Sequence, residues 1–398
     1  MSHAAIITSG RAETLARLAS ERLVLLVQDT TSLDFSHHPG TAGLGPLENA
    51  HCRGFLAHST LAVSQVGVPL GLMEQQVWVR REEDTGQRAQ RHARPLEAKE
   101  SYKWVKGLPG EAASVKGVQY VTVCDAEGHI YEFLDRVVEQ GLDFIVRAAD
   151  ARSFTVDDQS LFEAVAHQPV QDQYSLSLKR RPDREARPAQ VDLRFGSLTL
   201  RRPQRAQTLR HSLSLFVVDV VEPNPPPGQQ AVHWLLLTSL PVHSLDQAHQ
   251  IATWYTYRWL VERFHYVLKS GCKLEERQLR EEVRLERLLA VFSLVAWRLL
   301  WLTYQARLTP DLPATVALQP VEWQALCAFM QRSPALPRHP SPSATRWSAG
   351  LLNSVASWAV KPMATLASRS SGAAGPAFRT LSRPGLSRCL PLLYFSCG

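Results

Sequence analysis

Apolar runs separated by polar turns predict strands in the first part of the chain. Residues 1–20 are expected to form a short leader with one or two helical turns. The run Leu23–Gln28 is almost wholly apolar, which is typical of a strand buried on both faces. Residues 54–65 and 69–80 predict two more strands, and Gly67 between them predicts a hairpin turn. Three strands in a meander therefore open the predicted fold.

A strand–helix–strand unit is predicted after a charged loop. Residues 99–108 have the spacing of a helix, and residues 119–125 form an apolar run that ends in an acid. A helix over residues 129–141 then leads to a strand over residues 143–149. A helix that joins two strands in this way favours parallel pairing of the strands.

Alternating apolar and polar positions predict a β-rich insertion over residues 151–232. Basic and Pro-rich links separate its expected strands, which lie at residues 174–178, 191–195, 197–200 and 211–221. Residues 234–241 predict one more apolar strand. This part of the chain therefore interrupts the alternation of strands and helices on either side of it.

Two long helices are predicted after these strands. Ser244 is a typical N-cap for the first of them, which contains the segment Trp254–Lys269. The second helix is expected over residues 281–308, and residues 317–330 have helical spacing as well. Beyond about Ala349 the chain is rich in Ser, Ala, Gly and Pro without a sustained period, so no regular structure is predicted there.

The segment Trp254–Lys269 has a polar stripe opposite an apolar one. In a continuous helix Tyr255, Arg258, Glu262 and Lys269 share an arc of roughly 60°. The pattern predicts that one face is buried and that the other holds a carboxylate between two cations and a phenol. Most surface helices have such a stripe, so the stripe alone indicates no chemistry.

Two further acids follow apolar strands and could meet Glu262. Asp29 ends the first predicted strand, and Asp125 ends a later strand of the same predicted sheet. Three carboxylates that lie close together repel one another unless cations hold them, and carboxylates are ligands that Mg²⁺ prefers. Two Mg²⁺ ions could then activate a phosphodiester for in-line attack. Each aspartate alone is more typical of a strand-end cap or a turn than of a metal ligand. For the three acids together, both interpretations stay open here.

Composition narrows the classes without deciding between them. The chain has 398 residues, 45% of them hydrophobic, and a formal charge of +7, which suits a globular protein with a polyanionic partner. Six scattered cysteines without a CxxC pair favour a reducing cytosol over a disulfide framework or a structural zinc site. The N-terminus lacks an apolar signal core, and the most apolar stretch, residues 288–302, is too short to span a bilayer.

Some clusters of polar residues have no specific pattern. The four histidines of the first strands lack the spacing of metal ligands, so we expect surface or loop positions; they are His37, His38, His51 and His58. The basic clusters Lys179–Arg181 and Arg201–Arg202 are compatible with contacts to a DNA backbone and equally with a solvated loop.

Several motifs in order resemble those of one known family. Tyr255, Arg258, Glu262 and Lys269 have the spacing Tyr, two residues, Arg, three residues, Glu, six residues, Lys. This spacing is the signature of bacterial DDE transposases of the insertion sequence four family. DTTSL from Asp29 is similar to the first catalytic motif, and VCDAEGHIYEFL, which contains Asp125, is similar to the second. HWLLLTSLPV resembles the strand before the catalytic helix, and the resemblance covers about residues 20–335.

The resemblance implies a fold and a mechanism. The implied fold is α/β: an RNase H-like mixed sheet flanked by helices, interrupted by a β-rich insertion and followed by a residual C-terminal helical region. Mg²⁺, which Mn²⁺ can replace, would be bound by Asp29, Asp125 and Glu262. The implied reaction is cut-and-paste transposition, in which a nick at the transposon end is followed by hairpin formation, hairpin opening and strand transfer into target DNA.

The resemblance also assigns DNA contacts and partners. Tyr255, Arg258 and Lys269 would bind phosphates near the cut, and Trp234 would be the platform on which a flipped transposon-end base stacks. The partners would be double-stranded DNA, as transposon end and as target, and a second copy of the chain in a homodimer. A cytoplasmic protein associated with the bacterial nucleoid is expected.

Two departures from the family bear on activity. Only 28 residues precede Asp29, where relatives have a helical domain that recognises transposon ends, so we expect that domain to be largely missing. From about Ser348 the tail loses the helical pattern of the family's dimerisation domain, which we interpret as a frameshift. These departures predict a weakened or inactive enzyme that pairs poorly.

The sequence thus divides into four predicted regions and supports rival functions. The regions are residues 1–150 and 233–308 for the catalytic core, 151–232 for the insertion and 309–398 for a degraded dimerisation region that is partly disordered. The main rival to a transposase is a non-catalytic DNA-binding remnant that inhibits a full-length transposase. A free-standing RNase H-like nuclease is the third hypothesis.

Overall fold

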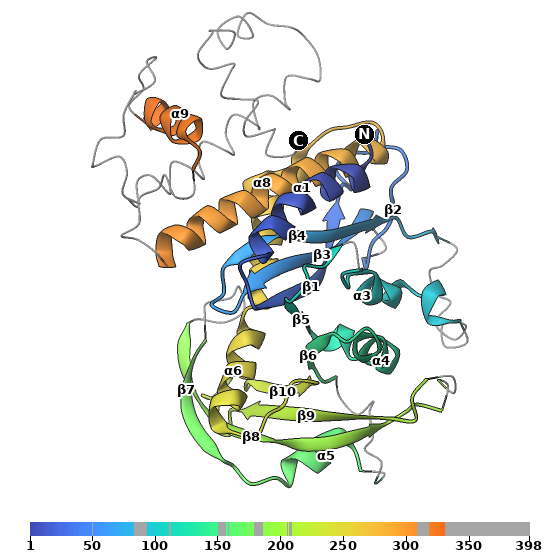
Figure 1. Cartoon of the computed structure of the whole chain (residues 1–398). Helices are drawn as coiled ribbons and strands as arrows, with labels where there is room; N and C mark the ends of the chain where they lie inside the picture. Colours follow the sequence, from blue (N-terminus) through green and yellow to red (C-terminus); the bar gives the residue numbers. More distant parts are fainter. Residues whose placement is uncertain are drawn as a thin grey trace, which may run out of the picture.

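A mixed sheet forms the centre of the molecule. The computed structural model describes residues 1–49, 51–82, 94–110, 113–149, 157, 159–178, 186–204, 206, 209–308 and 318–330. The strands within them are β1 (Leu23–Asp34), β2 (Gly45–Pro46), β3 (Arg53–Ser64), β4 (Pro69–Trp78), β5 (Gln119–Cys124), β6 (Asp143–Arg147), β7 (Asp172–Leu178), β8 (Arg187–Arg201), β9 (Ser212–Val221) and β10 (His233–Thr238). They join in the order β2-β3-β1-β5-β6-β10-β9-β8-β7, with β4 beside β3 (Figure 1).

The pairing directions confirm the predicted fold class. Strand β1 is parallel to β5, and β5 is parallel to β6, whereas β3 runs antiparallel to both β1 and β4. The order β4-β3-β1-β5-β6 with these directions is that of an RNase H-like sheet. The predicted hairpin between β3 and β4 is present, and Gly67 in its turn has the positive φ of +83° that glycine adopts readily.

The strands predicted for the insertion continue this sheet instead of forming a separate layer. Strand β10 is antiparallel to β6, and β9, β8 and β7 follow it outward in antiparallel pairs. The two strands predicted at residues 191–195 and 197–200 are one strand, β8. The separate prediction was wrong because Gly196 stays in register with Val217 of β9, so the ladder crosses it without a break.

Helices cover both faces of the sheet. They are α1 (His3–Leu18), α3 (Lys103–Lys106), α4 (Tyr131–Glu139), α5 (Leu161–Ala166), α6 (Leu245–Thr256), α7 (Trp259–Tyr266), α8 (Glu282–Leu308) and α9 (Pro320–Met330). Leu25 and Val27 of β1 are fully buried in one hydrophobic cluster with residues of α6, α7 and α8. Phe144 and Val146 of β6 are buried in a second cluster with residues of α4 and α5. The central strands are therefore covered on both faces, as their apolar runs predict.

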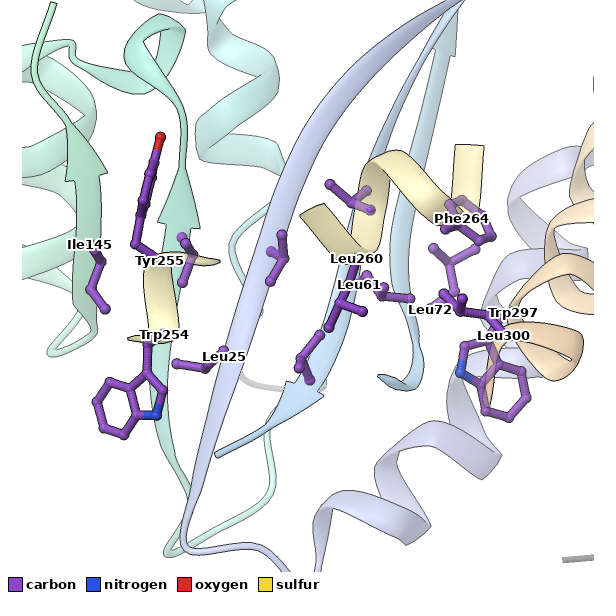
Figure 2. Close-up of a cluster of buried hydrophobic side chains, with 14 of the residues drawn as sticks. Leu25, Leu61, Leu72, Ile145, Trp254, Tyr255, Leu260, Phe264, Trp297 and Leu300 are labelled. Atoms are coloured by element: carbon purple, nitrogen blue, oxygen red, sulfur yellow. The ribbon is translucent and has the colours of Figure 1, made fainter. Parts of the chain in front are cut away.

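Helices α6 and α7 pack on the sheet through large apolar side chains. Figure 2 shows Trp254 near Leu25, and Phe264 near Leu72 and Trp297. All of these side chains are buried. This packing fixes the position of α7 over the strands, and with it the position of any polar side chain that α7 carries.

Two predictions for the N-terminal half were wrong. The expected leader is a 16-residue helix, α1, which begins after an N-cap at Ser2 and lies beside α8 (Figure 1). Its weak sequence pattern is compensated by contacts with β4, where the Arg11 guanidinium bonds the Glu74 carboxylate. The expected helix over residues 99–108 is limited to one 3₁₀ turn, Glu100–Tyr102, and the four residues of α3.

The predicted continuous helix over Trp254–Lys269 is interrupted twice. Helix α6 ends at Thr256, and the backbone N–H groups of Tyr257 and Arg258 donate to carbonyls three residues earlier, not four. After α7 the chain passes into a π-helical turn over Val267–Gly271. The segment contains no proline and no glycine before its last turn, so the sequence pattern did not indicate either interruption.

Other predictions agree with the structure or lie outside it. Helix α8 has the expected bounds within one residue, and α9 corresponds to the predicted helix over residues 317–330. In the described part of the chain, every helix is too short or too polar to cross a membrane. The aberrant tail and the cluster Lys179–Arg181 lie outside the described residues, and the four regional boundaries stay predictions.

Candidate active site

Asp29 and Asp125 lie at matching positions of two adjacent parallel strands. The ladder between β1 and β5 pairs Val27 with Val123, so two residues further on Asp29 stands beside Asp125, immediately after the end of β5. The sequence predicted that Asp29 ends its strand, and this prediction was wrong. Strand β1 continues to Asp34 because β3 pairs with it along its whole length. The expected juxtaposition of the two acids is nevertheless present.

Asp29 occupies a largely buried position. The pKa of Asp29 is raised to about 7, mainly by burial and in part by the nearby charges of Asp125 and Glu262. Arg258 and the backbone N–H of Thr30, 2.8 Å from Oδ1, act in the opposite direction. The three acids therefore repel one another across one site, and Arg258 is the cation that offsets this repulsion.

Arg258 connects Glu262 with Asp29. Its Nη2 donates to Oε1 of Glu262 at 2.5 Å, across one turn of the chain. Burial disfavours the Arg258 charge, but the nearby Tyr255, Glu262 and Asp29 together hold its pKa above the usual value. Arg258 is only 8% exposed, and Tyr255 only 2%. The prediction of an open polar face was therefore wrong for these two residues: Tyr255 belongs to the hydrophobic core cluster, and Arg258 is buried beside Glu262 and Asp29.

The three carboxylates are suitable ligands for a divalent cation, but they do not lie close enough together to bind one. Three carboxylates whose charges oppose one another are the ligands that a hard divalent cation would stabilise. Among the residues that the structure describes, however, no three His, Cys, Asp or Glu side chains gather closely enough to hold a metal ion together. The Arg258 guanidinium, bonded to Glu262, supplies the positive charge at this site.

A cavity of about 500 Å³ opens beside the acids. Its walls include Trp234 from β10 and Tyr255 from α6, whose rings meet edge to face at 5.4 Å between centroids. Arg258 and Trp259 continue the wall, with the guanidinium 4.8 Å from the indole centroid. Because Arg258 both lines this cavity and bonds Glu262, the cavity and the acids are parts of one site.

Two cavity residues were not identified from the sequence. Arg147 ends β6, the parallel neighbour of β5, and lines the cavity, where its charge lowers the pKa of Tyr255 against the larger effect of burial. Its position at the end of a third parallel strand was the signal that could have indicated it. Trp259 directly follows Arg258 in the sequence, and only the break of the helix brings it to the cavity wall.

Lys269 forms an ion pair with Glu275. It belongs to the π-helical turn, and its Nζ is 3.5 Å from Oε1 of Glu275. The same Oε1 accepts the backbone N–H of Asp34, so Glu275 connects Lys269 to the end of β1. The predicted common arc assumed one continuous helix, whereas Lys269 belongs to the π-helical turn after α7.

A network of buried polar side chains lies next to Asp29. Nδ1 of His265 in α7 lies 4.0 Å from Oδ2 of Asp29, and its Nε2 contacts the Ser59 hydroxyl at 3.3 Å. Gln75 donates to Ser59 and accepts from Ser293 of α8. Burial lowers the pKa of His265 to about 3, so the ring is neutral and acts as a polar packing group.

The four histidines that the sequence singled out do not form a common site. His58 is fully buried and contacts Gln28 and Thr30, whereas Nε2 of His38 contacts the Glu275 carbonyl oxygen at 2.7 Å. His58 thus corrects the expectation of a surface or loop position. In the basic cluster Arg201–Arg202, Arg202 donates to the Leu209 carbonyl at 2.7 Å, so part of its binding capacity is used within the protein.

The fold and the site define a class of protein. An RNase H-like sheet carries two aspartates on adjacent strands, and a covering helix adds a glutamate, as the resemblance to DDE enzymes implies. Residues 111–297 match the family model described as transposase DDE domain. The matched segment contains Asp125 and Glu262, while Asp29 precedes it. The match supports a DDE transposase, and enzymes with this domain generally act on DNA with the help of divalent metal ions.

Proposed function

We propose that this chain is a cut-and-paste DNA transposase. It would nick DNA at a transposon end, form and open a hairpin, and join the freed 3′ end to target DNA by phosphoryl transfer. The observation that carries this proposal is the placement of Asp29 beside Asp125, with Glu262 coupled to Asp29 through Arg258, next to a cavity with aromatic and cationic walls. The intact Tyr-Arg-Glu-Lys spacing favours the insertion sequence four family.

Asp29, Asp125 and Glu262 would hold Mg²⁺, or Mn²⁺ in its place. When bound, the metal would polarise the scissile phosphodiester and promote attack by water or a 3′ hydroxyl. The mutual repulsion that raises the pKa of Asp29 would be relieved by such a cation. For Glu262 to take part, its hydrogen bond with Arg258 would have to give way.

The cavity would receive an extrahelical nucleotide of the transposon end. Trp234 offers a ring on which an unpaired base stacks, and Tyr255 holds that ring from the side. Burial raises the pKa of Tyr255, so its phenol stays protonated and can donate a hydrogen bond to a phosphate oxygen. Arg258 and Arg147 supply guanidinium groups for the same phosphate. A phosphate bound here would compete with Glu262 for Arg258.

The remaining assignments follow from the same proposal. The protein would act in the bacterial cytoplasm on double-stranded DNA, near the nucleoid, and relatives act as homodimers. Lys269 would contact the DNA on the other side of the acids from the cavity. Its bond to Glu275 keeps its ammonium group at the end of β1.

A cleavage assay tests the proposal. The substrate is a duplex that carries the inverted repeats found in the DNA flanking the coding sequence, with Mg²⁺ or Mn²⁺. Nicking at the repeat that Glu262→Gln abolishes would support the proposal. Retarded mobility of this duplex without any nicking would favour the non-catalytic regulatory protein. Equal cutting of arbitrary DNA or of RNA–DNA hybrids would favour the free-standing nuclease.

A further inference from the structure

Tyr266 is an aromatic side chain that faces solvent. It is the last residue of α7 and is 69% exposed. Among the Phe, Trp and Tyr residues whose burial the structure describes, all the others are buried or partly buried. Tyrosine is enriched at binding interfaces, where its ring packs against a partner while its hydroxyl group stays in contact with water. The question is which partner this position on α7 suits.

Tyr266 lies on the same side of α7 as the proposed catalytic glutamate. Glu262 precedes it by four residues and Trp259 precedes Glu262 by three, which places all three on one side of the helix. The opposite side, with Val261 and Phe264, is fully buried. Aromatic rings therefore stand one turn before and one turn after Glu262, about 10 Å apart along the helix axis.

The first of these rings already belongs to the proposed DNA site. Trp259 lines the cavity beside Trp234, on the N-terminal side of Glu262. A DNA strand whose scissile phosphate reaches Glu262 would leave the site toward the C-terminal side, past Tyr266. The exposed Arg263 and the partly exposed Lys269 lie on that side and suit the backbone phosphates.

We propose that Tyr266 is a second stacking platform for DNA. It would receive a base on the side of the scissile phosphate opposite to the cavity of Trp234. Stacking on an aromatic ring tolerates any base, which suits a strand whose sequence is not fixed, such as target DNA. This inference rests on the proposed function, because it needs DNA to cross Glu262.

Binding of a forked DNA tests this role. The probe is a duplex with two single-stranded arms of arbitrary sequence and 2-aminopurine next to the junction. The full-length chain carries Glu262→Gln, so the probe stays intact. We expect Tyr266→Ala to weaken binding about tenfold and to relieve the quenching of 2-aminopurine, because a stacked base is lost. Tyr266→Phe and Tyr266→Trp should bind as tightly as the parent.

The controls separate this inference from the proposed function. Val66→Ala removes apolar surface at a position that is 67% exposed and should leave binding unchanged. If the parent binds no forked DNA, the proposed function fails and this inference fails with it. If the parent binds and Tyr266→Ala binds equally well, only the role of Tyr266 is wrong. A change in oligomeric state with unchanged DNA affinity would instead make Tyr266 a contact between copies of the chain.

Discussion

Arg258 is the residue on which the two halves of the candidate site depend. It bonds Glu262, offsets the charge of Asp29 and lines the cavity of Trp234. The sequence identified Arg258 as a phosphate ligand through the family spacing, and it placed Arg258 beside Glu262 on one stripe of the predicted helix. Arg258 precedes Glu262 by four residues, so the start of α7 brings the two side chains together. Residue types and spacing therefore predicted which residues meet, but not which state the free protein adopts.

Removing Arg258 should uncover the carboxylates for metal. We expect Arg258→Ala to bind Mn²⁺ about tenfold more tightly in the absence of DNA, because a competing charged hydrogen bond to Glu262 is lost. Electron paramagnetic resonance of free Mn²⁺ measures this affinity. Arg258→Lys, which keeps the charge, is the control and should change it less. An unchanged Mn²⁺ affinity in Arg258→Ala would show that the ion pair does not restrict the acids.

The break between α6 and α7 is the element that the sequence predicted least well. Periodicity indicated one helix, because Trp254–Lys269 has the apolar spacing of a helix throughout. The break follows from tertiary packing, in which Tyr257 lies against Gly67 in the turn of the distant β3–β4 hairpin. Trp254 also donates to the Gln65 carbonyl in that turn, at 3.3 Å. A contact between residues so distant in sequence leaves no local signal in the sequence. The buried strands, in contrast, were predicted because each one is a continuous apolar run.

Gly67→Ala should disturb this contact. The glycine has φ +83°, and an added Cβ would lie 2.8 Å from Cε1 of Tyr257. We expect a loss of about 2–4 kcal/mol in the free energy of unfolding, from backbone strain and the clash together. Chemical denaturation measures it. Gly141→Ala is the matched control, since Gly141 has φ +68° with nothing near its Cβ position and should cost only about 1 kcal/mol. Equal losses in both variants would contradict the packing role of Gly67.

The free energy of unfolding should depend on pH because of His58, a buried residue of strand β3. Burial lowers the pKa of His58 well below its usual value of 6.5, and the charge of Lys103 lowers it further. Below pH 6.5 the unfolded chain binds a proton that the folded protein refuses, so the free energy of unfolding falls with acidification. This histidine contributes about 1.4 kcal/mol per pH unit to that fall. Denaturation of His58→Gln between pH 6.5 and 5 should show a shallower slope than the parent, and an identical slope would contradict a neutral buried ring.

At the scale of the whole molecule, one sheet organises both the acids and the cavity. Asp29 lies on β1, and Asp125 directly follows β5. The cavity wall includes residues of β10, which continues the same sheet beyond β6. The sequence predicted the α/β class and most strands, since burial on both faces leaves a clear apolar run. It did not predict that the insertion strands extend the core sheet, because pairing partners far apart in sequence are not encoded in local periodicity.

The central claim is that Asp29, Asp125 and Glu262 together bind the metal that cuts DNA. The most direct measurement replaces each acid in turn with cysteine and follows nicking of the inverted-repeat duplex in Mg²⁺ and in Mn²⁺. Thiolates bind Mg²⁺ poorly and accept softer metals more readily. The account predicts that all three variants lose nicking in Mg²⁺ and regain part of it in Mn²⁺. A variant that nicks normally in Mg²⁺, or three variants that stay inactive in Mn²⁺ while the parent cuts, would contradict it.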